Sequence, residues 1–127
     1  MKATELRIGN YVWENYSGEM IIRSIIYNSP VTTHPKDNGS HTIHLSKTLK
    51  LPICGYDISA IKPIPITEEW LIKFGFKKLG KDTFYLGAIK IHKRNRGFVI
   101  AKRYVDILYI HQLQNLYFAL TGKELTI

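Results

Sequence analysis

A single cysteine, Cys54, is the only thiol in this sequence, so the chain cannot form an internal disulfide. A lone cysteine usually packs as a small hydrophobe, and we expect Cys54 to be buried and inert. Apolar runs are short and broken by charge, well below the ~20 residues that span a bilayer. The opening MKATELRIGNY lacks the apolar core of a signal peptide. These absences predict a cytoplasmic protein that does not enter a membrane.

Acidic residues are also scarce, with 10 Asp and Glu against 18 Lys and Arg and a formal net charge of +8. The excess is uneven, because residues 63–127 hold 11 basic and 5 acidic residues whereas residues 1–62 hold 7 and 5. Between residues 73 and 103 the only acid is Asp82. Such a concentration is typical of a surface that meets phosphate or another anionic partner. The alternative is a lysine-rich, solvated face that keeps the protein soluble.

Motifs that carry chemistry are missing as well. The sequence contains no Gly-x-Ser-x-Gly turn for a nucleophilic serine, no glycine-rich phosphate loop and no Gly-x-Gly-x-x-Gly fingerprint. Cys54 with a distant histidine is the only nucleophile and base that can be paired, and the few acids offer little for acid–base chemistry. We therefore predict a protein without enzymatic activity and without a cofactor.

Metal binding is an alternative, because His34, His41, His44 and Cys54 lie close together in the sequence. His41 and His44 are three positions apart in a predicted strand, where an odd separation points side chains to opposite faces. In a loop or a helical turn, both histidines could reach one metal ion. We predict no metal site here and keep a site at these four residues as the alternative.

The first half of the chain has the pattern of short strands separated by turns. Apolar residues alternate in four segments, LRIGNYVW, EMIIRSIIY, HTIHLS and YDISAIKPI, which Gly, Asn, Pro and Ser separate. Short antiparallel strands bury their inner faces most economically by curling into a barrel, which also protects the sheet edges. We predict an SH3-like small β-barrel for residues 1–62.

The pattern changes after Pro63-Ile64-Pro65, which favours an extended connection and marks a second subdomain, residues 63–127. In ITEEWLIKFGF, Thr67 can cap a helix, the two glutamates fall in its first turn, and Gly75 can end it. The apolar residues between these signals would form the buried stripe of the helix. An antiparallel sheet and a second helix are expected to follow.

The segment TFYLGAIKIHKRNRGFVIAKR predicts a hairpin with a tight turn at Asn95-Arg96. A two-residue turn pairs Ile91 with Ile100, Lys93 with Phe98 and His92 with Val99. One face is then apolar, and small residues at Gly97, Val99 and Ala101 would leave the other face flat. This second face, with the turn, is the predicted nucleic-acid-binding site. Its residues are Lys90, His92, Arg94, Arg96 and Arg103.

The C-terminal stretch YIHQLQNLYFALTGKEL predicts a helix that packs on the sheet and stops at Gly122. Its predicted apolar stripe consists of Tyr109, Ile110, Leu113, Leu116, Tyr117 and Leu120. A neighbouring face carries His111, Gln114, Asn115 and Phe118 at helical spacing. We expect this polar face to fix the packing of the two halves, with His111 and Asn115 hydrogen-bonding to backbone.

Three stretches, ELRIGNYV, IKPIPITEEWLIKFGF and HQLQNLYFALTGKEL, resemble a family of small uncharacterised proteins found in gut Bacteroidetes genomes, their prophages and their phages. The resemblance spans nearly the whole chain and implies an intracellular, phage-encoded protein. It brings no activity, cofactor or catalytic residue with it.

Together these patterns predict an α+β protein in which an SH3-like barrel is followed by a helix, an antiparallel sheet and a C-terminal packing helix. The favoured function is nucleic-acid binding, with Tyr16, Tyr27 and Tyr56 as further aromatic candidates for base stacking. A basic, aromatic surface suits an acidic protein partner equally well, so a protein-interaction module, such as a phage factor that engages a host protein, is an alternative. The sequence does not determine the oligomeric state.

Overall fold

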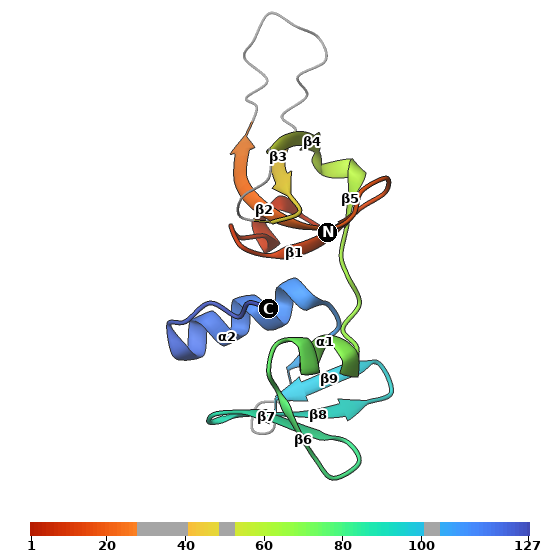
Figure 1. The fold of residues 1–127 in the computed structure, drawn as a ribbon, viewed down its shortest axis with the longest axis vertical. Helices are drawn as coiled ribbons and strands as arrows, with labels where there is room; N and C mark the ends of the chain where they lie inside the picture. The colour runs from red at the N-terminus through yellow and green to blue at the C-terminus, as the bar shows by residue number, and fades with distance from the viewer. Residues whose placement is uncertain (28–40, 49–52, 101–104) are drawn as a thin grey trace, which may run out of the picture. The chain divides into compact units, whose positions relative to one another are not determined.

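The computed structural model describes residues 1–27, 41–48, 53–100 and 105–127. Over these ranges the protein is α+β, with two five-stranded antiparallel sheets and two α-helices (Figure 1). The chain divides into two compact units, Met1–Pro63 and Ile64–Ile127, and each unit contains one of the sheets. Both α-helices belong to the second unit.

The first unit is an antiparallel sheet with the strand order β4-β3-β2-β1-β5. Its strands are β1 (Tyr11–Glu14), β2 (Gly18–Tyr27), β3 (His41–Ser46), β4 (Cys54–Asp57) and β5 (Ile61–Lys62), with two short 3-10 helices, η1 (Ala3–Glu5) and η2 (Ile58–Ala60). A β-bulge between Ile22 and Ser24 bends the long strand β2. The core of this unit consists of Leu6, Val12, Met20, Ile22, Ile43, Leu45 and Ile61.

Two predictions for the first unit are wrong. The segment YDISAIKPI does not form one strand, because η2 separates β4 from β5. The Asp57 carboxylate accepts a hydrogen bond from the Ser59 N–H at 2.8 Å and so stabilises this turn. Cys54 is exposed rather than buried. It is the first residue of β4, and β4 lies at an edge of the sheet, where fewer neighbours cover a side chain.

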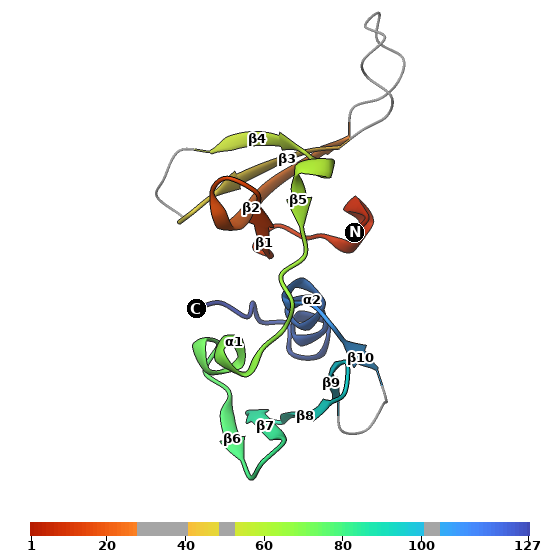
Figure 2. The same ribbon diagram turned by 90° about the vertical axis from the view of Figure 1, so that its right-hand side faces the viewer.

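The second unit is an antiparallel sheet with the strand order β10-β9-β8-β7-β6. Its elements are α1 (Glu68–Lys73), β6 (Lys77–Leu79), β7 (Thr83–Leu86), β8 (Ile89–Arg94), β9 (Gly97–Ile100), β10 (Asp106–Ile107) and α2 (Ile110–Thr121). Both helices lie on the same side of this sheet (Figure 2). The edge strands β6 and β10 were not predicted, because two or three residues are too few to show an alternating pattern.

The helix α1 begins and ends where the sequence predicts. The Thr67 hydroxyl accepts a hydrogen bond from the Trp70 N–H at 3.3 Å, which caps the first turn. Gly75 follows the last turn with a φ of 88°, a left-handed conformation that glycine adopts without strain. Trp70 and Phe74 are both buried, and their ring centroids lie 5.5 Å apart. The short helix therefore presents its aromatic side to the interior of the unit.

Apolar side chains cover the inner face of the second sheet. Phe84 and Ile91 are fully buried ladder partners on β7 and β8. Phe84 also meets Phe98 of β9 edge to face, with ring centroids 5.8 Å apart. Phe98 pairs in turn with the buried Ile107 of β10. The predicted apolar face of the hairpin is thus confirmed for Ile91 and Phe98.

The helix α2 is confirmed, but its buried stripe differs from the predicted one. Its fully buried residues are Ile110, His111, Leu113 and Gln114. Leu120 and Phe118 are 45% and 38% exposed. The Gln114 side-chain amide donates a hydrogen bond to the Leu125 carbonyl at 3.0 Å, so the segment after the helix folds back along this side. This return of the chain accompanies the burial of Gln114, which apolar periodicity alone places outside the core.

Candidate nucleic-acid interface

The hairpin β8–β9 has the register predicted from the sequence. Ile91 pairs with Ile100, His92 pairs with Val99, and Lys93 pairs with Phe98. The last pair, Arg94 and Gly97, is closed by a turn whose two residues are Asn95 and Arg96. Gly97 has a φ of 101°, which favours glycine at the point where the chain leaves the turn. The positions of the predicted basic residues along the two strands follow from this register.

Side chains alternate along β8 between charged and apolar environments. Neighbours along a strand point to opposite faces of the sheet, whereas ladder partners share a face. Lys90, His92 and Arg94 therefore lie on one face of β8, and Ile91 and Lys93 lie on the other. Lys90 and Arg94 are exposed and Ile91 is fully buried. The strand thus carries three predicted site residues on the face opposite to the core.

The charged face continues across β7 and β6. Tyr85 of β7 is the ladder partner of Lys90 on one side and of Lys77 on the other. Lys77 and Lys90 are exposed, and Tyr85 is half-buried between them. We call the surface formed by Lys77, Tyr85, Lys90, His92 and Arg94 the basic face.

Sequence reasoning missed Lys77 and Tyr85. The signal was present, because Gly87 and Ala88 form a two-residue connection between Leu86 and Ile89, which pair with each other. That connection fixes the register of β7 against β8 and sets Tyr85 opposite Lys90. Lys77 requires one further step, because the strand β6 was not predicted.

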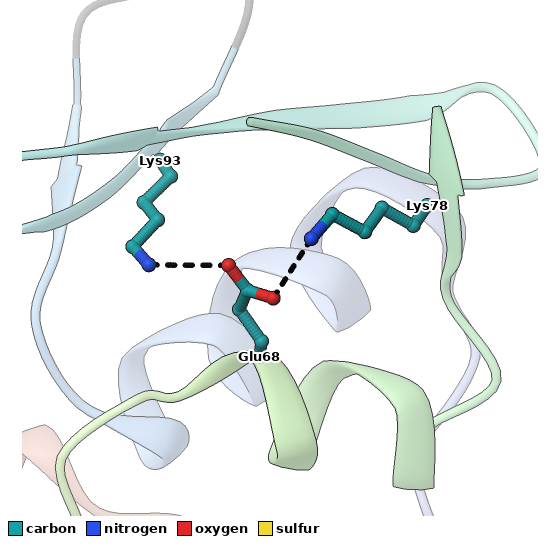
Figure 3. Close-up of polar contacts among 3 residues, drawn as sticks. All are labelled: Glu68, Lys78 and Lys93. Carbon is teal, nitrogen blue, oxygen red and sulfur yellow. Dashed lines mark hydrogen bonds and ion pairs between the residues drawn. The ribbon is translucent and has the colours of Figure 1, made fainter. Parts of the chain in front are cut away.

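Two lysines of the inner face share one acidic partner within the unit. Lys78 and Lys93 each place their amine nitrogen 3.1 Å from a carboxylate oxygen of Glu68 in the first turn of α1 (Figure 3). The hydrogen bonds from Lys78 and Lys93 hold the pKa of Glu68 below its usual range. The basic residues of the sheet therefore fall into two sets, one paired with α1 and one on the basic face.

Charged residues also lie in the β8–β9 turn and on the edge strand β10. Arg96 is exposed, and within the described ranges neither Arg96 nor Lys90 has an acidic partner. Asp106 of β10 shares the basic face, since it pairs with Val99, and it is exposed. The predicted site residue Arg103 lies outside the described residues. The positive surface is consequently established from β6 to the β8–β9 turn.

One part of the basic face is less open than predicted. Val99 is only 4% exposed, although it lies on the same face as its partner His92. A Cβ built on Gly97 would lie 3.2 Å from the Leu108 side chain and would collide with the Ile107 carbonyl oxygen. Leu108 follows β10 and lies over Gly97, so the β9 side of the face is partly covered. The open part is centred on β7 and β8.

A cross-strand hydrogen bond positions His92. Its Nδ1 lies 2.8 Å from the hydroxyl of Thr83, the ladder partner of His92 on β7. The same arrangement occurs in the first unit, where Ser24 and His44 are ladder partners with their hydroxyl and Nδ1 also 2.8 Å apart. In both sheets the imidazole is held by its neighbouring strand, which fixes the ring orientation.

The residues of the alternative metal site are not brought together where the structure describes them. His41 and His44 lie in β3, and their odd separation places them on opposite faces. Cys54 pairs with Leu45, next to His44 in the strand, and so lies on the face opposite to His44. His34 lies outside the described residues. Within the described ranges, no three His, Cys, Asp or Glu side chains form a group that could hold a metal ion.

The aromatic candidates of the first unit differ in exposure. Tyr16 is 97% exposed in the turn between β1 and β2. Tyr56 is half-buried and packs against the hydrophobic core, so its ring contributes to the packing of the first unit. The side chain of Tyr27 lies outside the described parts of the chain. Trp13, which was not a candidate, is 43% exposed on β1.

Comparisons with protein-family models, with curated proteins and with solved structures found no match. In the parts of the chain that the structure describes, no helix has the length and apolarity to cross a membrane. The functional interpretation therefore depends on the geometry and charge of the basic face.

Proposed function

We propose that this protein is a non-enzymatic nucleic-acid-binding protein whose basic face, together with Arg96, contacts the phosphates. The observation that carries the proposal is the division of charge within β8. Lys90 and Arg94 are exposed on one face, whereas Lys93 reaches back to Glu68 at 3.1 Å. Lys90 has no acidic partner among the described residues, and an exposed cation of this kind can replace counterions along a phosphate backbone, which supplies most of the free energy of non-specific binding.

The side chains of the basic face match the chemistry of phosphate. The guanidinium groups of Arg94 and Arg96 can each donate two parallel hydrogen bonds to phosphate oxygens. In His92 the Thr83 hydroxyl occupies Nδ1, which leaves Nε2 as the ring nitrogen for a ligand. Arg103 was expected to add a further cation, and it stays a prediction because it lies outside the described residues.

The test is a double charge reversal, Arg94→Glu with Arg96→Glu. We expect the affinity for labelled DNA and RNA, measured by fluorescence anisotropy, to fall at least roughly tenfold, because about two phosphate contacts are replaced by repulsion. The matched control is Lys2→Glu with Lys123→Glu, which changes the net charge equally at two exposed residues outside the second sheet. Equal losses in both double variants would mean that the total charge matters and the basic face does not.

For the first unit we propose an SH3-like small barrel. The strand order supports it, because β5 returns past three intervening strands to pair with β1. The bulge in β2 supports it too, since a bulge increases the bend that a short sheet needs in order to curl around its core. The resemblance to Bacteroidetes phage proteins leads us to propose a phage-encoded, cytoplasmic protein.

A protein-interaction module is the second candidate, and the first unit carries the observation that favours it. Trp13 and Tyr16 are exposed by 43% and 97%, and such aromatic side chains are the usual anchors of protein interfaces. If this role is correct, a single host protein should co-purify with the chain and bind it with a defined stoichiometry. This binding should be lost in the Trp13→Ser variant. Retention of the same complex by Trp13→Ser would contradict a role for this residue.

A further inference from the structure

An aromatic ring lies between two cations in the middle of the basic face. Lys77, Tyr85 and Lys90 occupy one row across three adjacent strands, because Tyr85 is the ladder partner of both lysines. With neighbouring strands about 4.8 Å apart, the backbones of the two lysines are separated by roughly 10 Å across the tyrosine. Both lysines are exposed, and the half-buried tyrosine stays partly open to solvent.

We infer that the basic face binds single-stranded nucleic acid, with a base stacked on Tyr85 and the flanking phosphates on Lys77 and Lys90. This inference rests on the proposed function and narrows it to one class of ligand. Aromatic side chains on an open sheet stack unpaired bases largely without regard to sequence, while neighbouring cations follow the backbone. Apart from the imidazole of His92, which is held by Thr83, Tyr85 is the only aromatic ring that the ladder pairings place on the described part of the basic face.

The shape of the surface favours a single strand over a duplex. A protein reads a duplex by inserting a helix or a β-ribbon into a groove, and the bases of the duplex are already stacked on one another. In the second unit both helices lie on one side of the sheet (Figure 2). Lys78 and Lys93 reach Glu68 of α1 from the inner face, so this side is the one opposite to the basic face. The central part of the basic face lies in the middle of the sheet. An unpaired base can stack on this surface, whereas a duplex can contact it only through phosphates.

The test compares ligands and a substitution that removes the ring alone. The ligands are labelled oligothymidylate and oligouridylate of about 15 nucleotides and a duplex of the same length, since single-strand sites span about 4 to 16 nucleotides. The variant is Tyr85→Ile, which keeps an apolar, strand-favouring side chain. We expect its affinity for the single strands to fall roughly 5- to 150-fold and its affinity for the duplex to stay within about twofold. Tyr85→Phe, which keeps the ring, should bind single strands like the unaltered protein.

Charge reversal at Lys77 tests the row of Lys77, Tyr85 and Lys90 without altering the Tyr85 ring. We expect Lys77→Glu to weaken single-strand binding at least roughly threefold and to lower its dependence on salt. Thermal unfolding of each variant, followed by circular dichroism, establishes that it is folded under the binding conditions. If one of the two oligonucleotides alone loses affinity in Tyr85→Ile, the stacked ligand is identified as DNA or RNA.

Failure of this inference is distinguishable from failure of the proposed function. If a folded Tyr85→Ile variant binds single strands as well as the unaltered protein does, and the Arg94 and Arg96 reversal still weakens binding at least roughly tenfold, the stacking role is overturned and the basic face stands. If the unaltered protein binds none of these ligands, even at low salt, the proposed function and this inference both fail.

Discussion

The amine of Lys93 lies 3.1 Å from the carboxylate of Glu68, whereas Lys90, three residues earlier in the same strand, has its side chain on the opposite face. An inner lysine thus ties the sheet to α1 and an outer lysine faces solvent. Lys90 and Lys93 carry the same charge and belong to the same strand. Substituting each of them in turn therefore separates effects on stability from effects on nucleic-acid binding.

Reversing each lysine should have opposite consequences. We expect Lys93→Glu to lower the midpoint of thermal unfolding, because it sets a carboxylate beside Glu68, and to change nucleic-acid affinity by less than about threefold, since Lys93 does not lie on the basic face. Lys90→Glu should leave the midpoint nearly unchanged and weaken binding more strongly. Anisotropy titrations and melting curves on both variants check this. Equal effects of the two reversals on binding would contradict the assignment of faces.

The close approach of β9 to β10 makes Gly97 sensitive to substitution. A Cβ at this position would collide with the Ile107 carbonyl oxygen, and the φ of 101° is strained for other residues. We expect Gly97→Ala to lower the free energy of unfolding by at least about 2 kcal/mol in urea titrations. Gly87→Ala is the control, because Gly87 has a φ of 58° and open space around it, so only about 1 to 2 kcal/mol is expected. A loss at Gly97 no larger than at Gly87 would contradict the packing of Leu108 and β10 against the turn.

The ion pairs of Glu68 predict how stability changes with pH. The lysine hydrogen bonds lower the pKa of Glu68 in the folded state, so its ionised form stabilises the fold above its ordinary pKa of 4.5. This contribution is lost as the pH falls below that value and passes through the folded-state pKa. Glu68→Gln should therefore be less stable than the unaltered protein at about pH 7, and the difference should shrink towards about pH 3.

Glu14 is a second carboxylate whose titration changes the stability in acid. The contribution of Glu68 is therefore measured by comparing the unaltered protein with Glu68→Gln. Burial alone would raise the pKa of Glu14, but the hydrogen bonds it accepts, chiefly from Ser17 and also from Tyr16 and Asn15, lower it overall. The stability of the unaltered protein thus falls in acid for more than one reason. Unfolding measured at several pH values for the unaltered protein and Glu68→Gln isolates the contribution of Glu68. A difference that does not depend on pH would contradict the ion pairs.

The buried polar side of α2 is expected to serve the fold. Gln114 is 1% exposed and donates to the Leu125 carbonyl at 3.0 Å. Gln114→Ala should cost about 1 to 3 kcal/mol in unfolding free energy, because it leaves that carbonyl without its partner and removes buried volume. Nucleic-acid affinity should stay within about twofold of the unaltered protein wherever the variant is folded. A large loss of affinity in the folded variant would instead make this side of α2 part of a site.

Local signals in the sequence were sufficient for several elements. Thr67 and Gly75 mark the two ends of α1, and the turn at Asn95 and Arg96 fixes the register of β8 and β9. These signals act within a few residues, through a cap, a left-handed glycine or a tight turn. The two ends of α1 and the register of this hairpin were therefore predictable.

Features that depend on distant parts of the chain were not predictable in the same way. The burial of Gln114 accompanies a tail that folds back to Leu125, and Val99 is buried on a face where Leu108 covers the neighbouring Gly97. Cys54 was expected to be buried because of its residue type, but it begins an edge strand and is exposed. Tyr85 was missed because the register of β7 was not carried through to its partner Lys90.

The most direct test of the basic face is the salt dependence of binding to oligothymidylate. We expect a dissociation constant in the micromolar range or tighter at about 50 mM salt, rising steeply by about 200 mM, with a logarithmic slope near −0.7 for each phosphate contact. In the Arg94→Glu, Arg96→Glu variant this slope should be shallower, with a magnitude smaller by roughly one to two units. No binding at about 50 mM salt, or an affinity that salt does not change, would contradict nucleic-acid binding through this surface.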